Sequence, residues 1–347
     1  MKKMLSPPQE NCSSLFRHSQ DALRWEVFRT ALELGIFDHL EEPVNAETLA
    51  TKLKTHAGNT ELFLNALTAM GYVVKSGGFF QNGSLAKTFL LSRGDTSLIS
   101  SILFMSSWHT ALLGGGLKKL LQEGPPTPME MRDETLWAQA ARKVMNHSRC
   151  GRAQELARRI SLLPEFPGFS KMLDLGCGPG IIGLAVTARH PSLECVFFDR
   201  PGICEVIREV VAEYGMENRT EIREGDFEKD LLGEDYDCIM ANFCLGMTGE
   251  DTLRKIFEKA HSALTPSGML IITTAFLTDE DTAPEPSLFG WLAPLMQGSR
   301  FLLHREIFER ALLRAGFRSV SFEIIDTLDQ KVHGPITMIR ARKGEPL

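Results

Sequence analysis

Three aspartates, each at or just after the end of an expected strand, are the residues of this sequence best placed to do chemistry. Asp174 ends a first apolar run and stands directly before a glycine-rich turn, Asp199 ends the next run, and Asp226 follows a third expected strand. A carboxylate in such a position attracts a cation and repels phosphate. The three acids therefore favour a cationic ligand.

The turn after Asp174 contains Gly176, Gly178 and Gly180, which let the backbone approach a ligand where any Cβ atom would collide. Gly178, Gly180 and Gly183 also have the G-x-G-x-x-G spacing of dinucleotide sites, where a pyrophosphate binds at a helix N-terminus. That spacing alone is a weak signal, and the acid before the turn argues against phosphate. S-adenosylmethionine carries an ammonium and a sulfonium and no phosphate, so it is the favoured ligand.

Strand-like and helix-like segments alternate around these acids. Strands are expected at 171–175, 193–198, 220–223, 238–243, 269–273, 319–325 and 336–341, the last of them antiparallel. This pattern predicts an α/β fold for residues 167–347, a Rossmann-like, doubly wound, mostly parallel sheet with helices on both faces. Ligands of such sheets bind at the carboxyl ends of the strands, where the three acids would meet.

The preceding half of the chain is mainly helical. Residues 1–19 are predicted to form a flexible arm, and helices at 21–34, 46–54 and 60–70 are followed by a hairpin around Gly77 and Gly78. This order indicates a winged-helix-like domain at 20–95. Its third helix has one acid and no base, which argues against DNA reading and favours a packing and dimerisation surface. Residues 96–166 are interpreted as connecting helices that line an acceptor pocket.

Composition narrows the class of protein. The chain has 347 residues, enough for about two domains, and its net charge of -6 gives no support for nucleic acid or an anionic membrane as the partner. No apolar run approaches the roughly 18 to 20 residues that span a bilayer, and no secretory stretch follows Met1. We expect a soluble, cytoplasmic protein.

The seven cysteines are scattered, with no C-x-x-C pair. This distribution predicts reduced thiols and no metal site. Cys177, inside the glycine turn, and Cys244, after the fourth expected strand, either line the site or fill space in the core.

The Asp-Leu-Gly-Cys-Gly-Pro-Gly segment at 174–180, with Asp199 and Gly225-Asp226-Phe227, resembles the class I S-adenosylmethionine-dependent methyltransferases. With its N-terminal domain, the chain is similar to the dimeric small-molecule O-methyltransferase family. The resemblance implies a homodimer that uses S-adenosylmethionine as cofactor and methylates a small molecule.

The resemblance also implies roles for single residues. The backbone of 176–180 would cradle the amino-acid end of the donor, and Asp199 would accept hydrogen bonds from its ribose. Asp226 would bind the adenine amino group, and Phe227 would lie against the ring or belong to the core. Asn242 completes the expected donor site, together with Arg200, which stands where the family more often has an apolar residue.

Catalysis is where the sequence departs from the family pattern, because Gly246 occupies the position of the usual general-base His. A phenol with a pKa near about 10 benefits from a positioned base, whereas a thioether needs none and a thiol needs less. Methyl transfer itself can run largely on holding the acceptor in line with the donor methyl. O-, S- and C-methylation therefore stay open, as does a non-catalytic, donor-binding regulatory protein.

Other residues are candidates for the acceptor side. His147 is the candidate substitute base, and the candidate acceptor contacts are His109, Met145, Trp291 and Met296. The alternative interpretation of each is an ordinary core or surface residue. Arg149, Arg152 and Arg300 either hold an acceptor carboxylate or are solvated.

Overall fold

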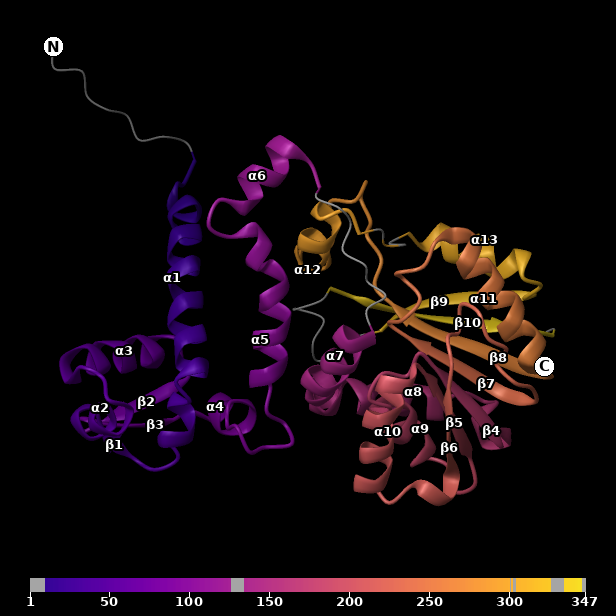
Figure 1. Cartoon of the computed structure of the whole chain (residues 1–347), viewed down its shortest axis with the longest axis horizontal. Coiled ribbons are helices and arrows are strands. Elements are labelled where there is room, and N and C mark those ends of the chain that lie inside the picture. The colour runs from indigo at the N-terminus through magenta and orange to yellow at the C-terminus, as the bar shows by residue number, and fades with distance from the viewer. Residues whose placement is uncertain (1–9, 126–133, 300, 302–303, 326–333, 345–347) are drawn as a thin grey trace, which may run out of the picture. The chain divides into compact units, whose positions relative to one another are not determined.

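The computed structural model describes residues 10–125, 134–299, 301, 304–325 and 334–344 (Figure 1). The chain forms two compact units that divide between Leu103 and Phe104. This division falls beyond the boundary expected after residue 95. Each unit is described by itself.

The first unit contains the helices and the hairpin predicted for it. Its helices are α1 (Ser13–Glu33), α2 (Ala46–Leu53), α3 (Ala57–Ala69) and α4 (Ser84–Phe89), with a short 3-10 turn at Ile36–His39. Strands β1 (Val44–Asn45), β2 (Val73–Ser76) and β3 (Phe79–Asn82) form an antiparallel sheet in the order β1-β3-β2. Helix α1 begins at Ser13, so part of the segment expected to be a flexible arm is helical; residues 1–9 lie outside the described residues.

Two helical stretches within residues 96–166 are interrupted at glycines. The first becomes α5 (Ile99–Trp108), a 3-10 turn (His109–Leu112) and α6 (Gly116–Glu123), with φ of 93° at Gly115. The second becomes α7 (Glu134–His147), a π-turn (Ser148–Arg152) and α8 (Ala153–Ser161), with φ of 117° at Gly151. Positive φ is accessible to glycine at little cost, so both residues redirect the chain.

A seven-stranded sheet forms the centre of the second unit. Its strands are β4 (Lys171–Leu175), β5 (Glu194–Asp199), β6 (Thr220–Glu224), β7 (Tyr236–Asn242), β8 (Leu264–Thr274), β9 (Ser319–Ile325) and β10 (Ile336–Arg342). Their order is β6-β5-β4-β7-β8-β10-β9, and β10 runs antiparallel to both of its neighbours. The mostly parallel sheet and its antiparallel last strand are confirmed.

Helices cover both faces of this sheet, as Figure 1 shows for α8 to α10 on one side and α11 and α13 on the other. The helices are α9 (Ile181–Thr187), α10 (Pro201–Glu213), α11 (Glu250–Ala263), α12 (Glu285–Met296) and α13 (Arg305–Arg314), with 3-10 turns at Phe166–Gly168 and Glu217–Arg219. Alternate residues of β4 face opposite layers: Met172 packs with α8 to α10, and Leu173 and Leu175 pack with α11 and α13. By this alternation Asp174 lies on the α8 to α10 side.

The strand order reverses at β4, which pairs with β5 on one side and β7 on the other. In open α/β sheets a ligand binds outside the carboxyl ends of the strands at such a reversal. The site is therefore expected beyond Leu175, Asp199 and Asn242. None of the helices in the described part of the chain is long and apolar enough to cross a membrane.

Candidate active site

A cavity of about 1010 Å³ opens at the carboxyl ends of β4, β5 and β7. The turn after β4 contributes Gly176, Cys177 and Gly178, and the end of β5 contributes Asp199 and Arg200. The segment after β7 and helix α7 supply further walls. The cavity thus lies where the strand order reverses.

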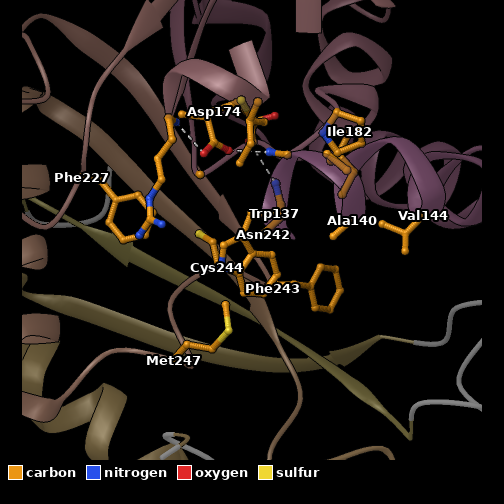
Figure 2. A pocket seen from close by; sticks show the side chains of 18 of the residues that line it. Trp137, Ala140, Val144, Asp174, Ile182, Phe227, Asn242, Phe243, Cys244 and Met247 are labelled. Carbon is orange, nitrogen blue, oxygen red and sulfur yellow. Dashed lines mark hydrogen bonds between the residues drawn. The ribbon is translucent and has the colours of Figure 1, made fainter. Parts of the chain in front are cut away.

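Asp174 lines the cavity and is only 1% exposed. Its Oδ1 accepts a hydrogen bond from Asn242 Nδ2 at 3.4 Å; both residues are labelled in Figure 2. Asn242 is fixed in turn by Thr273, whose hydroxyl donates to the Asn242 Oδ1 at 2.8 Å. The Asp174 Oδ2 atom is buried and has no hydrogen-bond partner within the described structure. Burial raises the pKa of Asp174 to about 7, against the hydrogen bond from Asn242. A bound cation would satisfy this carboxylate.

Asp199, 6% exposed, also lines the cavity. Its Oδ2 accepts a hydrogen bond from the backbone N–H of Gly178 at 2.8 Å, and its Oδ1 accepts one from the N–H of Arg200 at 2.8 Å. Burial raises the pKa of Asp199 to about 6, although these N–H donors favour the carboxylate. The carboxyl is therefore held in a fixed position, and each oxygen has a further lone pair for a ligand hydroxyl.

The glycines of the turn have different roles. A Cβ atom added to Gly178, whose φ is 54°, would meet nothing within 4 Å, so its backbone is open to a ligand. Gly180 is not among the described residues that line the cavity, and its Cβ would lie 3.3 Å from the ring of Phe197; its expected backbone contact with the donor stays a prediction. Gly183 allows α9 to pack on the sheet, because its Cβ would lie 2.5 Å from Asp174 Oδ2.

Phe227 and Glu228 line the cavity, whereas Asp226 does not. The carboxylate of Asp226 accepts hydrogen bonds from the Glu228 N–H at 2.9 Å and from Lys229 Nζ at 2.8 Å, within its own turn. Partial burial alone would raise the pKa of Asp226, but Lys229 and the N–H donor hold it below its usual value. Asp226 is thus held within its own turn and is not among the described lining residues, so its expected donor contact stays a prediction.

Helix α7 and the residue after it contribute a wall whose individual residues the sequence analysis did not name. Trp137, Ala140, Ala141, Val144 and Ser148 all line the cavity, and Figure 2 shows three of them, Trp137, Ala140 and Val144, at the cavity wall. These residues are three or four positions apart, which places them on one helical face. This periodicity is the sequence signal from which they could have been predicted.

Two candidates on α7, His147 and Met145, are not among the described residues that line the cavity. His147 ends α7 and is not one of the described lining residues, although Val144 and Ser148 on either side of it are. Met145 packs against the core on the α8 to α10 side of the sheet. The proposed base and the proposed acceptor contact therefore stay predictions.

The other acceptor candidates also lie outside the described lining. His109 is exposed on the 3-10 turn after α5, beside α12. Trp291 and Met296 belong to α12, where the Trp291 ring lies 4.5 Å from that of Phe301. Their acceptor roles stay predictions, and Arg300 falls outside the described residues.

The segment after β7 brings Phe243, Cys244, Met247 and Thr248 to the cavity, and Gly246 lies in the turn between them. Phe243 has φ of 59°, a left-handed conformation uncommon for a non-glycine residue, and its N–H donates to the Thr273 carbonyl at 2.9 Å. At the position where the resemblance expects a His, the neighbouring side chains are a thioether and a hydroxyl.

All seven cysteines are free. Cys177 and Cys244 line the cavity, and Cys244 Sγ donates to the Leu175 carbonyl at 3.2 Å. Burial raises the pKa of both thiols, so they remain protonated and act as packing groups. No group of His, Cys, Asp and Glu suited to a metal ion occurs among the described residues.

Comparisons with known proteins agree with this geometry. The profile of the O-methyltransferase domain matches residues 128–318, and that of the O-methyltransferase dimerisation domain matches residues 16–92. The chain is 28% identical to the N,N-dimethyltransferase OxyT of Streptomyces rimosus, covering 87% of this chain and 90% of that protein. It is 24% identical to the 3-hydroxy-5-methyl-1-naphthoate 3-O-methyltransferase of Streptomyces sahachiroi, covering 80% of this chain and 81% of that protein.

Among solved structures, human N-acetylserotonin methyltransferase in complex with SAM (S-adenosylmethionine) is similar, with a TM-score of 0.77 at 22% identity. The similarity covers 98% of this chain and 100% of that chain. At this identity it establishes the fold.

Proposed function

This chain belongs to the O-methyltransferase family with an N-terminal dimerisation domain, and we propose that it methylates a planar small molecule held beside α7. It is a methyltransferase, and its cofactor is S-adenosylmethionine, which supplies a methyl group on a sulfonium cation. The observation that carries the proposal is Asp174, whose buried Oδ2 has no partner among the described residues and lies in a lining that also includes aromatic and apolar side chains.

The residues of the cavity fit the donor group by group. Asp174 and Asp199 would both bind the donor as carboxylates. Asp174 would lie beside the positive charge of the donor, and Asp199 would accept hydrogen bonds from its ribose hydroxyls. Gly178 leaves open space for a ligand to approach the backbone. Phe227 offers a flat apolar face for adenine. Asp226, tied to Lys229, fixes the turn that carries Phe227.

The acceptor would bind between the α7 face and the segment after β7. Trp137, Val144, Phe243 and Met247 give this part of the lining apolar and aromatic character, which suits a planar molecule. Transfer then depends on holding the acceptor atom in line with the donor methyl.

We propose oxygen as the methylated atom, in keeping with the family. Two relatives of similar identity are named as an O- and an N,N-methyltransferase, so the fold accommodates different acceptor atoms. The lack of a His at Gly246 favours an acceptor that needs little help in losing a proton, and keeps a thiol, thioether or activated carbon as alternatives.

We also propose that the protein is a homodimer formed through the first unit. Phe16 and Leu23 on α1 are each 66% exposed and lie seven residues apart, on one helical face. An apolar face of this kind on a dimerisation domain suits a second copy of the chain.

The test is an assay with purified protein, S-adenosylmethionine and a panel of phenols, hydroxynaphthoates, thiols and thioethers. We expect S-adenosylhomocysteine to form with at least one acceptor, and the methylated product identifies the atom. Absence of S-adenosylhomocysteine with every acceptor would count against the proposed acceptor class.

A further inference from the structure

Arg152 places a cation in the apolar part of the cavity lining. It ends the π-turn Ser148–Arg152, in which Gly151 has φ of 117° and redirects the chain between α7 and α8. Its guanidinium carbon lies 4.6 Å from the centre of the Phe243 ring. Arginine on an aromatic face is stabilised by a cation–π interaction, which holds the planar group in a defined orientation.

The charged lining residues divide into two sets. Asp174, Asp199, Arg200 and Glu228 come from the ends of β4 and β5 and from the loop after β6, on the side we assign to the donor. Arg152 instead comes from the π-turn that follows α7. The acids match the ammonium and sulfonium of the donor, which also carries one carboxylate. Arg152 is a cation beside the aromatic ring of Phe243, a position that suits a negative charge on an aromatic acceptor.

We propose that Arg152 binds an oxyanion, such as a carboxylate, on a planar aromatic acceptor. This inference rests on the proposed function and names its substrate class. The guanidinium fork suits an oxyanion because it offers paired N–H donors and keeps its charge at any working pH. The hydroxyl of Ser299, a further lining residue, is buried without a hydrogen-bond partner in the described structure and supplies a second donor.

The chemistry of transfer agrees with this assignment. An acceptor fixed at its oxyanion by Arg152 and at its ring by Phe243 is restrained in both position and tilt, and such restraint is what in-line transfer requires. A nearby guanidinium also stabilises the ionised form of an acidic hydroxyl and lowers its pKa, which reduces the need for a general base. The arginine thus offers a physical reason why Gly246 is tolerated at the His position.

The experiment measures acceptor binding by calorimetry in the presence of S-adenosylhomocysteine, so that no turnover is needed. The probes are several hydroxynaphthoates and hydroxybenzoates, each paired with its carboxamide. We expect acids to bind more tightly than amides. Arg152→Gln should weaken acid binding about ten- to a hundredfold and amide binding less than about threefold, with partial recovery in Arg152→Lys.

Arg158→Gln is the matched control, because Arg158 is an exposed arginine of α8 paired with Glu155. It should leave both acceptor classes and S-adenosylhomocysteine unaffected. Equal binding of acids and amides to the native protein, or failure of every acid to bind, would overturn the oxyanion site. So would an Arg152→Gln effect that is the same for acids, amides and S-adenosylhomocysteine.

Other results would contradict the proposed function and not the oxyanion site. Acids that bind preferentially through Arg152 but are never methylated would contradict methyl transfer to this class and support the oxyanion site. Methylation of amides and acids with equal kcat/KM, unchanged in Arg152→Gln, would support the transferase and overturn the oxyanion site.

Discussion

At the scale of single residues, the site depends on carboxyls whose burial as charged groups destabilises the protein when no ligand is bound. Asp174 has an ordinary pKa of 3.8 that burial raises to about 7. A carboxyl whose folded-state pKa is raised contributes stability at low pH, and that contribution is lost as the pH rises from about 4 to about 7. The site therefore binds a cation with a carboxyl that burial makes easier to protonate in the free protein.

The variant Asp174→Asn separates the effect of this carboxyl on stability from its effect on donor binding. Near about pH 8 the free variant should unfold at a higher temperature than the native protein, because the amide carries no buried charge. Its affinity for S-adenosylmethionine should fall about tenfold or more. Thermal melts and calorimetry measure the two quantities. Asp226→Asn is the control and should weaken donor binding less, because that carboxylate is paired with Lys229; the reverse order would contradict our assignment.

Asp199→Ala should weaken donor binding more than His147→Ala does. The first variant removes an acceptor held at the cavity by the Gly178 N–H, whereas His147 lies outside the described lining. Dissociation constants for S-adenosylhomocysteine give the comparison directly. Equal losses in the two variants would mean that Asp199 is not a donor contact.

The sequence allowed some of these residues to be predicted and not others. Asp174 and Asp199 were accessible because each ends an apolar run, and strand alternation then fixes the side they face. The direction of the Asp226 side chain depends on Lys229 and the Glu228 N–H within a short turn, which strand patterns do not specify, so its donor contact stays a prediction. Arg152 was one of several candidate arginines, and only the three-dimensional contact with Phe243 distinguishes it.

At the scale of elements, the third glycine of the fingerprint serves packing. Gly183→Ala should lower the free energy of unfolding by about 1 to 3 kcal/mol, because its Cβ would lie 2.5 Å from Asp174 Oδ2 and 2.6 Å from Phe197 Cε1. Gly290→Ala in α12 is the control, with nothing within 4 Å of its Cβ, and should be neutral or stabilising. Denaturant titration measures both. Equal stability of the two variants would show that α9 can move away from β4.

Strands were easier to predict than helix boundaries. Strands buried on both faces of a parallel sheet are nearly continuous apolar runs, as in Glu194–Asp199, and these are visible in the sequence. The interruptions at Gly115 and Gly151 were missed, because a single glycine in a helical pattern costs only about 1 kcal/mol and does not by itself end a helix. The bend at Gly151 nevertheless lies directly before Arg152, which lines the cavity.

At the scale of the whole molecule, the exposed α1 face predicts association. Leu23→Glu should shift the protein toward monomer, because it places a charge on the apolar face that Phe16 shares. His18→Glu, on the opposite side of α1, is the matched control and should leave the oligomer intact. Light scattering coupled to gel filtration gives the mass of each. A native protein that is monomeric at high concentration would contradict the homodimer.

The central claim is that the cavity binds a cationic methyl donor through ionised Asp174 and Asp199. Calorimetric titration with S-adenosylmethionine at about pH 5 and about pH 8 tests it most directly. Because the pKa values of these carboxyls are about 7 and about 6, we predict tighter binding at the higher pH and release of protons on binding between them. Binding that does not change with pH, or tight binding of a nicotinamide dinucleotide in its place, would contradict the account.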